Sequence, residues 1–179
     1  MNPTMIDRDL FNKHLLTTNQ WAKKMFLDDP EDGIMPHLCV RKDEGGDDWT
    51  LDIYAFAEFG ETRYQLFEAI GTKYGQAKAH IPAIYLVSEG WLSISTKEEM
   101  EAHPDNRVMP SEDPDRQEVL LVSGLTLDMH TVIISHRIKR SPKSATLEEQ
   151  DFAEVAEARS PLLICFFRGY VTAFMEHIQ

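Results

Sequence analysis

Cysteine is scarce in this sequence of 179 residues, and long apolar runs are missing. Cys39 and Cys165 lie 126 positions apart and form no CxxC spacing, so the sequence predicts neither a disulfide framework nor a zinc ribbon. Residues 1–10 have no apolar core of the kind a signal peptide needs. The most apolar stretch, residues 162–175, is interrupted by Arg168 and is shorter than the roughly 20 residues of a spanning helix. We therefore expect a cytoplasmic protein with no membrane segment.

The common signature motifs of enzymes are also missing. The sequence contains no GxGxxG, GxxxxGK[ST], HExxH or GxSxG motif and no EF-hand spacing. These motifs place dinucleotides, phosphates, zinc, a nucleophilic serine and calcium, respectively. Their absence favours a non-catalytic protein, and we expect no cofactor.

Basic residues are few relative to acidic ones, with 18 Lys and Arg against 30 Asp and Glu and a net charge of −12. Affinity for a phosphate backbone comes mainly from Lys and Arg, so the sequence predicts no direct nucleic-acid binding. Basic or neutral partners suit such a chain better. The acidic excess lies in the first 120 residues, because residues 121–179 contain 6 basic and 7 acidic side chains.

Hydrophobic periodicity predicts a single α+β domain, residues 1–179, with the order α-β-β-α-β-β-β-α. Apolar residues at three- and four-residue spacing mark helices over 6–28 and 60–78, and alternation around a Gly-centred turn marks a hairpin over 36–57. Three further strands are expected over 83–95, 118–127 and 129–139. Helices should then pack on a five-stranded sheet that is mixed or mainly antiparallel. The acidic segment 146–159 is read as helical, and residues 96–116 as a long acidic surface loop.

The expected last helix, residues 161–177, carries apolar side chains around nearly its whole circumference. One apolar stripe would suffice to dock it on a sheet. The excess indicates either a helix enclosed in the core or one shared with a second subunit, and we favour the second interpretation. It predicts a homodimer with the interface residues Phe166, Phe167, Tyr170 and Phe174.

The segment 110–118 concentrates four carboxylates and one guanidinium just before an expected central strand. Asp113, Asp115 and Glu118, joined across the sheet by Glu89, are hard oxygen ligands of the kind that Mg²⁺ and Mn²⁺ prefer. Arg116 would stabilise developing negative charge in a hydrolytic reaction. The alternative is a solvated loop in which Asp-Pro units set turns and Arg116 pairs with a carboxylate. We favour the solvated loop, because acidic surface loops are common.

Glu89 interrupts an apolar strand, where a polar side chain is costly. Either it pairs with Arg116 or Arg137, or it faces water at a strand end, or it acts as an acid or base. Gly90 next to it would mark a bulge that turns Trp91 outward.

The segments Ser88-Glu89-Gly90-Trp91 and 110–119 together resemble a pattern in small uncharacterised prokaryotic and phage-associated proteins. The resemblance covers about a quarter of the chain and implies no activity, cofactor or catalytic residue.

Three functions follow as hypotheses. The first is a non-catalytic cytoplasmic binding protein that acts as a homodimer. The second is a Mg²⁺- or Mn²⁺-dependent hydrolase that uses Glu89, Asp113, Asp115 and Glu118, with Arg116. The third is an acidic DNA mimic or phage-related accessory protein, which would need carboxylates spaced like phosphates.

Overall fold

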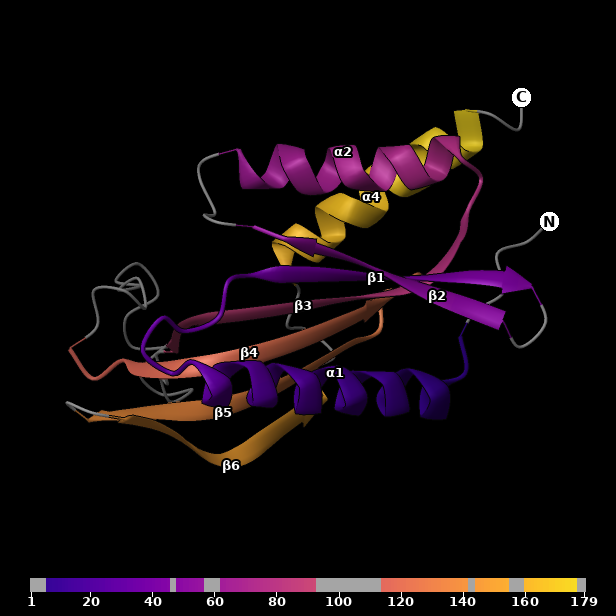
Figure 1. Ribbon diagram of the computed structural model, residues 1–179. Coiled ribbons are helices and arrows are strands. Elements are labelled where there is room, and N and C mark those ends of the chain that lie inside the picture. Colours follow the sequence, from indigo (N-terminus) through magenta and orange to yellow (C-terminus); the bar gives the residue numbers. More distant parts are fainter. Residues whose placement is uncertain are drawn as a thin grey trace, which may run out of the picture.

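The computed structural model describes residues 6–45, 48–56, 62–92, 114–141, 144–154 and 160–176. In these ranges the fold is α+β, as predicted, with three helices and one antiparallel six-stranded sheet (Figure 1). The elements in chain order are α1 (Arg8–Asp28), β1 (His37–Gly45), β2 (Asp48–Ala55), α2 (Arg63–Gln76), β3 (His80–Leu92), β4 (Gln117–Thr126), β5 (Thr131–Ser141), β6 (Ser144–Glu154) and α4 (Pro161–Glu176).

The sheet has the strand order β2-β1-β3-β4-β5-β6. The strands β1 and β2 form the predicted hairpin, with Cys39 opposite Ile53. From β3 to β6 each strand pairs with the next one in the chain, and the pairing of β1 with β3 joins the hairpin to this meander. The edge strands in the described part of the chain are therefore β2 and β6.

One face of the sheet is covered by α1 (Figure 1). The Asp7 side chain caps this helix by accepting hydrogen bonds from the backbone N–H groups of Asp9 and Leu10. Phe11 packs so closely on β4 that a Cβ at Gly124 would lie 2.7 Å from the Phe11 ring. The core on this face contains the buried side chains of Phe11, Leu15, Phe26, Tyr85, Val87, Leu120, Val122 and Ile134.

The helices α2 and α4 cross on the opposite face (Figure 1). A Cβ at Gly71 would lie 2.0 Å from the Phe166 carbonyl oxygen, and one at Gly169 would lie 2.2 Å from the Glu68 carbonyl oxygen. Glycine is therefore required at both positions, because it lets the two backbones touch. Arg168 and Glu68 form an ion pair across the same contact.

The prediction of five strands is wrong, because residues 146–154 of the segment read as helical belong to a sixth strand, β6 (Ser144–Glu154). Ala145 points into the core under α1, and Leu147 packs against that core. Glu148 forms ion pairs with Arg137 and Lys139 of the neighbouring strand β5. Glu148, in the segment read as helical, thus takes part in a cross-strand charge pairing.

The interface predicted on the last helix is corrected by the packing of α4. Phe166, Phe167 and Tyr170 are buried inside the chain, at 0%, 3% and 2% exposure, and Phe174 packs against the same core. The helix α4 has apolar side chains around most of its circumference because it packs against both α2 and the sheet. These four side chains are therefore not an open docking face.

Among the described helices, none combines the length and the apolar character needed to cross a bilayer. Of the predicted acidic loop, residues 96–113 lie outside the described ranges, and 114–116 lead directly into β4.

Candidate functional site

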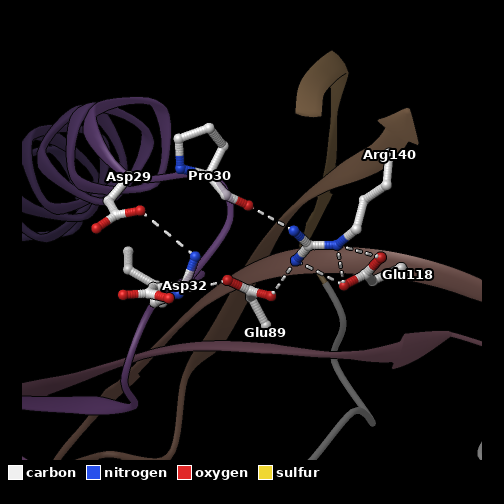
Figure 2. A network of polar contacts seen from close by, with 7 residues as sticks. Asp29, Pro30, Asp32, Glu89, Glu118 and Arg140 are labelled. Carbon is white, nitrogen blue, oxygen red and sulfur yellow. Dashed lines mark hydrogen bonds and ion pairs between the residues drawn. The ribbon is translucent and has the colours of Figure 1, made fainter. Parts of the chain in front are cut away.

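Two of the acidic residues singled out from the sequence belong to a polar network at one end of the sheet, on the face covered by α1. Glu89 of β3, Glu118 of β4 and Arg140 of β5 lie on three adjacent strands (Figure 2). Even-numbered residues of β4 and β5 and odd-numbered residues of β3 point to this face, since Leu120, Ile134 and Val87 are part of the core under α1.

The Arg140 guanidinium is the centre of the network. Its Nε atom donates to both carboxylate oxygens of Glu118, at 2.9 Å each, and its Nη2 atom donates to Glu89 Oε2, at 2.9 Å. Its Nη1 atom donates to the Pro30 carbonyl oxygen at 2.5 Å. Pro30 follows the end of α1, where a helix leaves carbonyl groups unpaired and its dipole favours a cation.

The loop between α1 and β1 closes the network from the other side. The backbone N–H of Ile34 donates to Glu89 Oε1 at 2.5 Å, and Gly33 precedes it with a φ of 70°. A Cβ at Gly33 would lie 2.5 Å from the same Glu89 oxygen. Glycine is therefore needed at this position for two reasons: the backbone is left-handed, and a carboxylate lies too close for a side chain.

Burial raises the pKa of the Glu89 carboxyl above its usual value. The Ile34 N–H group and the positive charge of Arg140 oppose that rise, and the charge of Glu118 adds to it. The hydrogen bond to Glu118 raises the pKa of Arg140, so the guanidinium remains charged. Two carboxylates thus share one cation that belongs to the protein.

The structure brings together two of the five candidate site residues. Glu89 and Glu118 meet at Arg140, whereas Arg116 lies over the ring of Trp91, with 4.6 Å from Cζ to the ring centroid. Asp115 is exposed in the turn before β4. Asp113 lies outside the described residues.

The predicted partners of Glu89 are wrong. Its ion pair is with Arg140, and Arg137 instead pairs with Glu148. The alternation along β5 was the signal that sequence reasoning missed, because Arg140 shares the inward face of Ile134 and Ile138, whereas Arg137 points the other way. The expected bulge at Gly90 is not found either, since β3 and β4 keep one register from Ala83 to Leu92.

Within the described ranges, no group of three or more His, Cys, Asp or Glu side chains is arranged to hold a metal ion. The position between the two carboxylates is filled by the Arg140 guanidinium (Figure 2). A hollow of about 360 Å³ lies beside Arg140, lined by Pro30, Glu31, Ser141, Ser144 and Ala145. The network can thus bind the end of α1 to three strands.

A second polar cluster, which sequence reasoning missed entirely, lies at the β1–β2 hairpin. Arg41 is 5% exposed, and it donates from Nε to Asp43 Oδ1 at 2.8 Å and from Nη1 to His14 Nδ1 at 2.5 Å. The Trp49 ring covers this cluster, with its centroid 4.6 Å from that of His14 and 5.2 Å from the Arg41 Cζ atom. Burial and then the charge of Arg41 lower the pKa of His14, so the imidazole is neutral and can accept from the guanidinium.

Beyond this cluster, the edge strand β2 exposes large apolar side chains. Trp49, Leu51 and Ile53 are 45%, 36% and 50% exposed, and they alternate along the same face of the strand. On the opposite face, Asp52 accepts a hydrogen bond of 2.5 Å from the Tyr74 hydroxyl, which lies 2.7 Å from the Tyr54 hydroxyl. Among the described residues, β2 is thus fixed to α2 on one face, and the apolar side chains on its other face remain partly exposed.

Comparison with protein-family models, curated proteins and solved structures gives no match to this chain.

Proposed function

We propose that this chain is a non-catalytic binding protein that acts as a homodimer. The observation that carries the proposal is the edge strand β2, which presents Trp49, Leu51 and Ile53 to solvent along one face. Soluble proteins usually protect such edges, because unpaired backbone groups beside apolar side chains attract another strand. An edge left open in this way is suited to a partner.

The network at Arg140 supports the non-catalytic part of the proposal. Glu89 and Glu118 are engaged by a guanidinium and by the Ile34 N–H group, so they anchor a loop. A catalytic carboxylate needs a free oxygen within hydrogen-bond reach of a substrate.

The two thiols support a cytoplasmic location as part of the same proposal. Cys39 and Cys165 are both free, and burial raises the pKa of the Cys39 thiol to about 12. Free thiols suit a reducing compartment.

Mass measurement in solution tests the proposal. Sedimentation equilibrium or size-exclusion chromatography with light scattering should report twice the chain mass of 20.6 kDa. A strict monomer at high protein concentration would contradict it.

The hydrolase is retained as a second candidate on one observation, the convergence of Glu89 and Glu118 on a single nitrogen atom of Arg140, at 2.9 and 2.8 Å. Under this alternative Mg²⁺ or Mn²⁺ would bind between carboxylates that now hold a guanidinium. Calorimetric titration with either ion discriminates the two functions. Binding that is lost in Glu118→Gln supports the hydrolase, and no heat at millimolar metal excludes it.

A further inference from the structure

The open edge of β2 fits one particular partner. We propose that a second copy of this chain pairs with β2, antiparallel and about a two-fold axis at Leu51, so that the two sheets form one continuous sheet. The inference rests on the proposed homodimer and names the surface that forms it.

Among the described residues, no second strand pairs with the outer edge of β2. In the described part of the chain β2 hydrogen-bonds to β1 on one side only. Its eight residues contain no Lys or Pro, which commonly protect an edge strand from pairing, and its charged side chains are Asp48 and Asp52. The outward N–H and C=O groups of β2 are therefore available to a second strand.

The apolar side chains on this edge are already held in place. The Trp49 ring packs against the His14 ring and lies over the Arg41 guanidinium, yet 45% of its surface is exposed. Tyr74 fixes the other face of the strand through Asp52 and Tyr54. A surface that is ordered before binding loses little conformational entropy on association.

The sequence of β2 favours one register when the strand pairs with β2 of a second copy. In a two-fold antiparallel pair centred on Leu51, Trp49 lies opposite Ile53 of the partner subunit, and Leu51 lies opposite Leu51 of the partner subunit. On the other face, Thr50 lies opposite Asp52 of the partner subunit, which is a hydrogen-bonding combination. The apolar side chains thus meet each other, and no two carboxylates are opposed.

The competing register is disfavoured by charge. Centring the pair on Asp52 also aligns seven residues, but it places this carboxylate directly opposite itself. Like charges directly opposite each other on paired strands are destabilising. This preference for one self-pairing register argues for a second copy over an unrelated peptide, whose sequence would have to supply the same complement.

The decisive variant is Leu51→Lys, which places two ammonium groups face to face on the two-fold axis. We expect the dimer dissociation constant to rise by at least about 30-fold, because the centre of an interface contributes most of its affinity. Leu16→Lys is the matched control: Leu16 is also exposed, at 43%, but lies on α1. The control should leave the dimer unchanged, and circular dichroism should show both variants folded.

A mixing experiment tests the register itself. Leu51→Glu alone should also be monomeric, but an equimolar mixture with Leu51→Lys should form a heterodimer, because opposite charges then meet at the axis. Should either variant fail to fold, a mixture of Ile53→Lys with Trp49→Glu also brings opposite charges together, since these two residues lie opposite each other in the proposed register.

The outcomes separate this inference from the proposed function. Loss of the dimer in Leu51→Lys and its recovery in the mixture support the β2 pairing. A dimer of unchanged affinity in Leu51→Lys overturns the pairing and leaves the homodimer in place on another surface. A monomeric wild-type protein overturns both.

Discussion

Gly33 shows at the residue scale how one position without a side chain holds a network together. Its φ of 70° turns the chain after α1, and the absence of a Cβ lets Glu89 approach the backbone of the loop. Both conditions must be met before the Ile34 N–H group can reach the carboxylate. The loop and the sheet therefore depend on each other through this residue.

Substitution of Gly33 tests this dependence. We expect Gly33→Ala to lower the free energy of unfolding by about 1–3 kcal/mol, from the left-handed backbone and from the contact of its Cβ with a carboxylate that Arg140 holds in place. Urea denaturation measures the change. Gly90→Ala is the control, because its Cβ would meet only Leu121, at 3.7 Å, and the change should be within about 1 kcal/mol of zero or stabilising. Equal losses in both variants would contradict this account of Gly33.

His14 predicts a pH dependence of stability. Burial and the charge of Arg41 lower its pKa in the folded state below the usual value of 6.5. As the pH falls below that value, the unfolded chain takes up a proton that the folded chain resists, so this residue lowers stability in acid.

The measurement compares urea unfolding at about pH 7.5 and pH 5.5 for the wild type and for His14→Gln. The variant lacks the titrating group, so its free energy of unfolding should fall less between the two pH values than that of the wild type. The difference between the two proteins should be at most about 1 kcal/mol, because part of the ring faces solvent. Identical pH dependence in the two proteins would show that His14 does not titrate in this way.

Only part of the candidate site could be predicted from the sequence. Glu89 and Glu118 stood out because carboxylates next to buried strands need partners. Arg140 did not, because a basic residue at the end of an expected strand is usually solvated. Its role depends on the loop after α1 and on the alternation of β5, which are properties of the folded chain.

At the scale of elements, the crossing of α2 and α4 is set by glycine. Gly71 and Gly169 each lie against a carbonyl oxygen of the other helix. A backbone oxygen cannot rotate away as a side chain can, so an added methyl group must push the helices apart.

We therefore expect Gly71→Ala to destabilise the protein by at least about 2 kcal/mol, although Ala is the better helix former by about 1 kcal/mol. Thermal and urea unfolding measure the effect. Ala69→Gly, at an exposed position of the same helix, isolates helix propensity and should cost about 1 kcal/mol. A stabilised Gly71→Ala variant would disprove the close contact.

The elements differed in how well they could be predicted. Periodicity identified α1, α2, α4, the β1–β2 hairpin and the three strands after it, since each carries apolar residues at its own spacing. Strand β6 was not predicted, because Ala145 and Leu147 stand among polar and charged residues. The partners of Glu148, Arg137 and Lys139, lie on β5. The enclosed position of α4 was the less favoured of two interpretations, because its second partner, α2, is about a hundred residues earlier in the chain.

At the scale of the whole molecule, the charge of −12 acts against self-association. Two copies repel each other over the range that salt leaves unscreened. The contacts proposed at β2 are mostly apolar, so salt does not screen them.

The salt dependence of the dimer follows from this balance. Raising the ionic strength from about 0.01 M to about 1 M shortens the Debye length from about 30 Å to about 3 Å, so the dimer should tighten several-fold. Sedimentation equilibrium across this range measures it. A dimer that weakens with salt would be held by ion pairs, which contradicts an apolar β2 contact.

The contact between α2 and α4 also has a consequence for the order in which the chain folds. Strands β4, β5 and β6 pair with their neighbours in sequence across short connections, so these hairpins close short loops and form fast. Glu68 and Arg168 are separated by 100 residues, and their helices meet only after every strand has been synthesised. Until then the apolar face of α2 and the sheet beneath it have no cover, and a nascent chain of this protein is most prone to aggregation in that interval.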